Sequence, residues 1–147
     1  MYVSGGLAEV LGKETILVVE DAEAIRRLVC AMLGQQGYQC LEAVDGVDAL
    51  RLLDETPTPI HLVLTDVIMP KMTGAELGLR LVRLRPELPI VFMSGYSDDP
   101  MVRNLERVPL MFLAKPFTAA TLLEKVRQAL DQPWNGLPDI VSNSARR

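Results

Sequence analysis

The chain contains short apolar runs that stop abruptly at polar residues, and this pattern limits the folds that it can adopt. Stretches with helical periodicity separate these runs, which cover Ile16–Val19, Gln39–Ala43, Ile60–Thr65, Pro89–Met93 and Leu110–Ala114. The first, third and fourth runs are continuously apolar, as expected for strands buried on both faces of a parallel sheet. We therefore predict an α/β fold with a doubly wound, five-stranded parallel sheet and five helices.

The stretches between the runs carry the signals of helices. A stripe at helical spacing, predicted to face the sheet, consists of Ile25, Leu28, Val29, Met32 and Leu33. Residues suited to capping predict where the other four helices begin: Asp45, Thr73 with Glu76 three positions later, Asp99-Pro100 and Thr118.

These elements predict one domain over residues 15–130. Residues 1–14 are rich in glycine and lack periodicity, which predicts a flexible lead-in or linker. Residues 131–147, interrupted by Pro133, Gly136 and Pro138, predict a C-terminal tail. No apolar run reaches the ~18 residues of a membrane helix, and no signal-peptide pattern opens the chain. We expect a soluble, cytoplasmic protein without membrane contact.

The charge and the cysteines narrow the classes of function further. A formal net charge of −4, with both signs interspersed, offers no basic patch for nucleic acid. Cys30 and Cys40 lack the spacing of metal ligands, and His61 is the single histidine. Reduced thiols are expected, with a disulfide between the two cysteines as the alternative.

Chemically active residues follow four of the apolar runs. Glu20-Asp21 follows the first run, Asp66 the third, Ser94 the fourth and Lys115 the fifth. A single acidic residue at a strand end usually caps a helix or solvates a loop. The carboxyl ends of parallel strands, however, meet at one edge of the sheet, where such folds bind their ligands. The coincidence therefore predicts one shared site.

Charge indicates what such a site would bind. Three neighbouring carboxylates without histidine or cysteine suit a hard cation, most plausibly Mg²⁺. Asp66 would be a nucleophile toward a phosphoryl donor and form an acyl phosphate. Lys115 and the metal would neutralise the phosphoryl oxygens, and Ser94 would offer them a hydroxyl group.

At this point the chain resembles the receiver domains of bacterial two-component response regulators. The matching segments are ILVVED at 16–21, TDVIMPKMTG at 65–74, FMSG at 92–95 and LAKPF at 113–117. The resemblance implies a flavodoxin-like strand order 2-1-3-4-5. It also implies a signalling domain that is not an enzyme in the usual sense, since it catalyses only its own phosphorylation and dephosphorylation.

The resemblance implies a role for each matching residue around the phosphoryl group. Asp66 corresponds to the phosphoacceptor. Asp21 corresponds to a direct Mg²⁺ ligand, Glu20 to a ligand acting through water, and the backbone carbonyl of Ile68 to the third protein ligand.

Further positions correspond to the switch of the family. Ser94 occupies the hydroxyl switch position, and Lys115 the lysine that precedes a cis peptide bond to Pro116. Phe112 falls at the aromatic switch position, although without the resemblance it fits equally well as a core aromatic of the last strand.

Two residues depart from the commonest forms of the family. Ile68 is apolar where many receivers carry a polar side chain, and Tyr96 is bulky two residues after Ser94. Both flank the expected path of the water that hydrolyses an acyl phosphate. We hypothesise that they shield the phosphorylated state and lengthen its lifetime.

The resemblance also implies partners. A histidine kinase or histidine phosphotransfer protein would supply the phosphoryl group, and phosphorylation would shift a conformational equilibrium. A downstream protein, or a second copy in a homodimer, would then read the face formed by the fourth helix, fifth strand and fifth helix. The segment 92–96 resembles receivers of hybrid sensor kinases, so we favour that origin over a stand-alone receiver.

The sequence fits two other classes of protein less well. A Mg²⁺-dependent phosphatase with an aspartate nucleophile, of the haloacid dehalogenase type, places two aspartates two residues apart after its first strand, whereas Glu20 and Asp21 are adjacent. A nucleotide-binding module would need a glycine-rich loop after the first strand, and the sequence has none.

Overall fold

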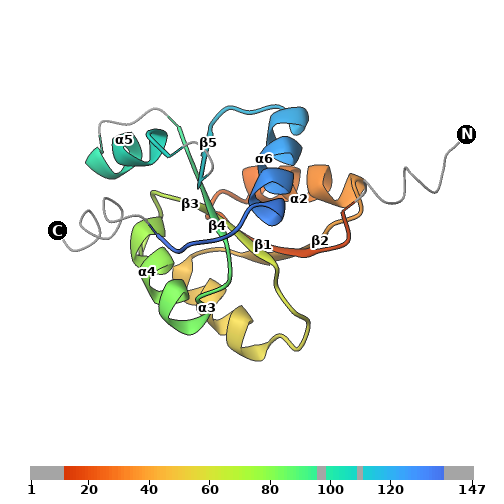
Figure 1. The fold of residues 1–147 in the computed structure, drawn as a ribbon, viewed down its shortest axis with the longest axis horizontal. Helices are drawn as coiled ribbons and strands as arrows, with labels where there is room; N and C mark the ends of the chain where they lie inside the picture. The colour runs from red at the N-terminus through yellow and green to blue at the C-terminus, as the bar shows by residue number, and fades with distance from the viewer. Residues whose placement is uncertain (1–11, 96–98, 109–110, 138–147) are drawn as a thin grey trace, which may run out of the picture.

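A computed structural model describes residues 12–95, 99–108 and 111–137 (Figure 1). Strands and helices alternate along the chain. The strands are β1 (Thr15–Val19), β2 (Gln39–Ala43), β3 (Leu62–Asp66), β4 (Ile90–Ser94) and β5 (Phe112–Ala114). The helices are α2 (Glu23–Gln35), α3 (Gly46–Glu55), α4 (Gly74–Leu84), α5 (Pro100–Glu106) and α6 (Ala119–Asp131).

The strands form one parallel sheet in the order β2-β1-β3-β4-β5, which confirms the predicted fold class and strand order. Helices α2 and α6 cover one face, and α3 and α4 cover the other (Figure 1). Among the described residues, no helix has both the length and the apolarity that crossing a bilayer requires.

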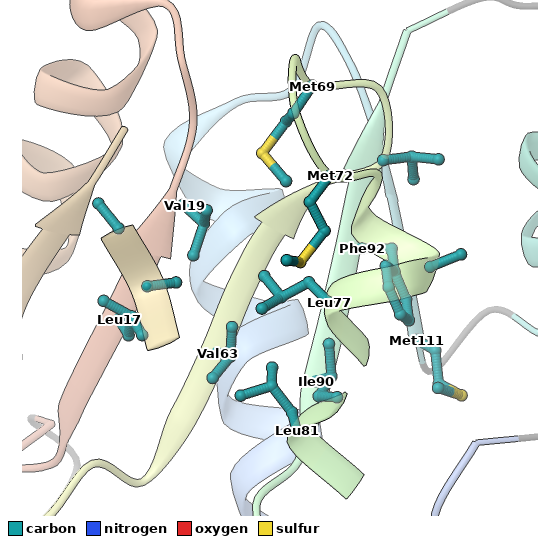
Figure 2. Packing of buried hydrophobic residues seen from close by; sticks show 14 of the residues in the cluster. Leu17, Val19, Val63, Met69, Met72, Leu77, Leu81, Ile90, Phe92 and Met111 are labelled. Carbon is teal, nitrogen blue, oxygen red and sulfur yellow. The ribbon is translucent and has the colours of Figure 1, made fainter. Parts of the chain in front are cut away.

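Side chains that alternate along each strand divide the core into two layers. Ile16 and Val18 join the layer beneath α2 and α6, whereas Leu17 and Val19 join the layer beneath α3 and α4. Figure 2 shows part of the second layer, which includes Phe92 of β4, Leu77 of α4 and Met72 of the loop before α4. Every residue of β1, β3 and β4 is buried, which explains the continuous apolar run in each of these strands.

The predicted caps are found at three helices. The side chains of Asp45, Thr73 and Thr118 accept hydrogen bonds from backbone N–H groups three residues later. At α4 the Glu76 carboxylate accepts a hydrogen bond from the Thr73 hydroxyl. In a usual capping box it would accept from the backbone N–H of Thr73 instead.

The predicted inner face of α2 is wrong at Leu28. Its side chain is 56% exposed, whereas Arg26, Val29 and Leu33 are buried. Arg26 lies on the buried side of α2, where its guanidinium donates to the carbonyl oxygen of Glu20, and Leu28 lies on an edge of the apolar stripe that faces outward. That outward edge forms a surface discussed below.

Residues on both sides of the predicted domain, 15–130, also make contacts with it. Before β1, Gly12 donates a backbone hydrogen bond to Gln36, and Glu14 pairs with Arg127 of α6 at 2.8 Å. The hydrogen bond from Arg127 lowers the pKa of Glu14 from 4.5 to about 2. After α6, Trp134 and Leu137 pack against the layer beneath α3 and α4. Packed structure thus reaches at least from Gly12 to Leu137.

Candidate functional site

The ends of β1, β3 and β5 bring together the charged residues singled out by sequence. Val19 of β1 lies beside Thr65 of β3, so the following residues, Glu20 and Asp66, are neighbours at the carboxyl edge of the sheet. Lys115 follows β5, and its backbone N–H donates to the carbonyl of Ser94 at the end of β4. We call the site formed by Glu20, Asp21, Asp66 and Lys115 the carboxylate crevice.

An ammonium group joins two of the carboxylates. Lys115 Nζ lies 2.6 Å from Glu20 Oε1 and 3.1 Å from Asp66 Oδ2. Burial alone would lower the pKa of Lys115, but hydrogen bonds and charges from Glu20 and Asp66 outweigh it and raise the pKa. Lys115 is therefore a fixed positive charge at neutral pH. It offsets the repulsion between two carboxylates that are almost withdrawn from water.

The third carboxylate is more open. Oxygen atoms of Glu20, Asp21 and Asp66 lie within 4.8 Å of one another, and of the three only Asp21 is exposed. Desolvation, followed by its interaction with Glu20, raises the pKa of Asp21. An oxygen-only set with one face open to water fits a hard divalent cation that keeps several water ligands, as Mg²⁺ does.

A buried arginine supports the crevice from behind, and sequence reasoning missed it. Arg26 Nη1 donates to the carbonyl oxygen of Glu20 at 2.9 Å, and its Nε pairs with Glu42 at the same distance. Glu20 also accepts a hydrogen bond from the backbone of Ala22. The only sequence signal for this role was the position of Arg26 beside the apolar stripe of α2. Arginines that are exposed to solvent also occur at such positions, so the pattern does not identify a buried one.

The backbone after Asp66 is held as closely as its side chain. Asp66 Oδ1 accepts a hydrogen bond from the N–H of Ile68 at 3.4 Å, and the N–H of Gly74 donates to the carbonyl of Val67 at 2.7 Å. A Cβ at Gly74 would lie 2.4 Å from the carbonyl oxygen of Asp66. Glycine therefore permits α4 to begin directly against the end of β3, a requirement that the sequence pattern did not reveal.

The other predicted site residues lie around the crevice. Ser94 is buried, and its hydroxyl donates to the carbonyl of Gly95 at 3.3 Å rather than to Asp66. Phe112 is half-buried against the layer beneath α3 and α4. The Lys115–Pro116 peptide bond is cis, as predicted. The Ile68 side chain is 51% exposed beside the crevice, and Tyr96 lies outside the described residues.

An apolar groove adjoins the crevice. It occupies about 540 Å³ between α2 and the segment after β5, and Ile25, Leu28, Met32, Pro116 and Phe117 line it together with Lys115. Leu28, which the sequence pattern placed inside, is 56% exposed in this groove. The groove is thus an apolar surface that reaches Lys115 at the carboxyl edge of the sheet.

Comparison with known proteins agrees with this geometry. The family model described as "Response regulator receiver domain" matches residues 16–127. Sensor kinase CckA of Brucella abortus is 36% identical over 122 residues, which are 82% of this chain and 13% of the kinase. The response regulator receiver protein CpdR of the same organism is 31% identical over 121 residues, covering 78% of this chain and 95% of CpdR.

Solved structures agree at the level of the fold. The crystal structure of a response regulator receiver domain protein from Clostridium thermocellum superposes with a TM-score of 0.71 at 26% identity. The match covers 80% of this chain and 94% of that one.

Proposed function

Since this chain belongs to the response regulator receiver domain family of two-component signalling, we propose that Asp66 is its phosphoacceptor. The observation that carries the proposal is the pairing of Lys115 with both Asp66 and Glu20 in a crevice that also holds Asp21. Such an arrangement holds one carboxylate ready for attack among groups that can neutralise a phosphoryl group.

The proposed reaction uses few groups. An Asp66 carboxylate oxygen attacks the phosphorus of a phosphohistidine, the P–N bond breaks, and an acyl phosphate forms. Lys115 then lies close enough to hold a phosphoryl oxygen, because its ammonium already touches Asp66 Oδ2. Glu20, Asp21 and Asp66, with the carbonyl of Ile68, would hold Mg²⁺, which supplies charge neutralisation.

The test is phosphorylation by a small donor. Incubation with acetyl phosphate and Mg²⁺ should add one phosphoryl group per chain, measured by intact mass. Asp66→Asn should abolish the addition, because an amide is not a nucleophile of this kind, and chelation of Mg²⁺ should do the same. Stoichiometric labelling of the Asn variant would refute the assignment. Repeated turnover of a phosphate ester would instead support the aspartate-dependent phosphatase.

We propose that the phosphodonor protein docks in the apolar groove. The groove is exposed, apolar and adjacent to Lys115, which suits the apolar face of a helix that carries the donor histidine. Relatives include both a sensor kinase and a stand-alone receiver protein, so the donor is a histidine kinase or a histidine phosphotransfer protein. The preferred setting remains the receiver of a hybrid kinase.

Leu28→Asp tests the docking surface. A charge there should slow transfer from a phosphohistidine protein selected for its transfer to the unmodified chain, by roughly tenfold or more, because the contact must desolvate the carboxylate. Labelling by acetyl phosphate should not change, because Leu28 lies outside the carboxylate crevice. Leu84→Asp is the matched control, since Leu84 is 60% exposed on α4. Equal transfer to both variants would contradict the docking site.

We also propose that Ile68 lengthens the phosphorylated state. Its backbone contacts Asp66 while its side chain stands exposed at the rim of the crevice, where attacking water must pass. Ile68→Asn should therefore speed decay of the acyl phosphate several-fold, followed as loss of labelled mass over time. Unchanged decay would show that the side chain does not shield the bond.

We propose that phosphorylation of Asp66 changes the surface of the domain through Ser94 and Phe112 on the neighbouring strands. Ser94 and Phe112 lie on β4 and β5, which pair in register with Ser94 beside Ala114. A phosphoryl group on Asp66 would draw the Ser94 hydroxyl away from the carbonyl of Gly95, and Phe112 would move inward into the space released. The face of α5, β5 and α6 would then change for a downstream partner or a second copy.

A further inference from the structure

The contact between α2 and β2 carries two thiols that the proposed function does not use. Cys30 lies on α2 and Cys40 on the neighbouring edge strand β2. Cys40 Sγ lies 3.9 Å from the carbonyl oxygen of Cys30, within hydrogen-bond reach of a sulfur atom. Both residues are only partly buried, so small solutes can approach them.

The two side chains also interact with each other. A hydrogen bond with Cys40 is the main cause that raises the pKa of Cys30, and burial adds to it. The same bond lowers the pKa of Cys40, against the opposing effects of burial and Glu42. The opposite directions of the two pKa shifts favour Cys40 over Cys30 as the thiol that ionises first. A thiolate with a second thiol in contact is the arrangement of oxidation-sensitive cysteine pairs.

We propose that Cys30 and Cys40 form an intramolecular disulfide when the chain meets a hydroperoxide. The Cys40 thiolate attacks one peroxide oxygen, the O–O bond breaks, and the leaving oxygen takes a proton to become water or an alcohol. The resulting sulfenic acid is attacked by Cys30, which loses its proton, and the S–O bond breaks to release a second water. The cysteines are oxidised by two electrons and the peroxide is reduced by two.

The crosslink would act on a contact that supports the carboxylate crevice. Arg26 lies one helical turn before Cys30, and Glu42 lies two residues after Cys40, so their ion pair joins the same two elements. Arg26 also holds the carbonyl of Glu20. Oxidation would link α2 covalently to β2 beside this arginine. The disulfide would also restrict the conformations of the unfolded chain, which should raise the melting temperature by several degrees. This inference does not rest on the phosphoacceptor role of Asp66.

The test treats the reduced full chain with a small molar excess of hydrogen peroxide and then with N-ethylmaleimide. The expected product is a monomer that has lost two hydrogens, accepts no maleimide and melts above the reduced chain. Its disulfide should be found between the peptides that contain Cys30 and Cys40. Two maleimide adducts after peroxide, or a disulfide-linked dimer as the main product, would overturn the proposal.

Single substitutions test the order of the steps with the fold preserved. Cys30→Ser should leave Cys40 to accumulate as a sulfenic acid that dimedone traps. Cys40→Ser should react with peroxide several-fold more slowly, because it loses the thiol that ionises more readily and keeps Cys30, whose pKa burial still raises. Faster trapping at Cys30 than at Cys40 would contradict the assigned order, and far-ultraviolet circular dichroism checks that both variants are folded.

Discussion

Lys115→Met should both destabilise the apo protein and remove phosphorylation. The substitution takes away the ammonium that touches Glu20 and Asp66, and Glu20 is only 1% exposed. A buried charge left without its partner costs roughly 3 kcal/mol. The rate at which Asp66 is labelled should fall by roughly 100-fold, because a positive group that would face the phosphoryl oxygens is lost. Urea unfolding, followed by fluorescence of the single tryptophan, and intact mass give the two measurements.

A double substitution separates these two effects. Adding Glu20→Gln to Lys115→Met should restore part of the stability, because it removes one of the two buried carboxylates that lost the ammonium. It should not restore labelling, since the ammonium is still absent. Mg²⁺ should stabilise the single Lys115→Met variant more than the unmodified chain, because the cation takes over part of the neutralisation. Full labelling of either variant would show that Lys115 has no part in phosphoryl transfer.

Gly74→Ala should produce the second large effect, through the backbone rather than through charge. The added methyl group would lie 2.4 Å from the carbonyl oxygen of Asp66 and 2.9 Å from Cα of Val67. Both are backbone atoms, so α4 and the end of β3 must separate, at a cost of roughly 2 kcal/mol. Because Asp66 ends β3, labelling should fall with stability even though no charged group has changed.

Gly34→Ala is the matched control. Gly34 also lies in a helix, and a Cβ there would meet nothing within 4 Å. Alanine should stabilise the exposed helix by roughly 0.5–1 kcal/mol, with labelling unchanged. If both alanine variants were equally stable and equally labelled, the close approach of α4 to Asp66 would not matter for the site.

Most of the crevice was predictable because each of its residues directly follows, or ends, a recognisable strand. The continuous apolar runs identified β1, β3 and β4, and parallel strands necessarily bring their carboxyl ends to one edge. Glu20, Asp21, Asp66 and Lys115 could therefore be grouped before any distance was known. Their distances agree with the grouping, while their chemical roles are the proposals tested above.

Strand bounds were less predictable because hydrogen-bond register is not visible in composition. β3 was expected over Ile60–Thr65 but runs from Leu62 to Asp66. His61 instead lies at its edge, where Nδ1 accepts a hydrogen bond from the backbone of Thr15. Asp66 pairs with Met93 of β4, and this pairing extends the strand to the Asp66 carboxylate.

The sequence by itself determined the fold class, the strand order through its family resemblance, and the set of charged residues at the carboxyl edge of the sheet. It could do so because burial on two faces leaves a local trace in the type of residue along each strand. Only the tertiary structure decided that Leu28 faces outward, that Arg26 holds Glu20 from behind, and that Gly74 must lack a side chain. Each of these depends on atoms from segments far apart in the chain, and contacts of that kind leave no periodic signal.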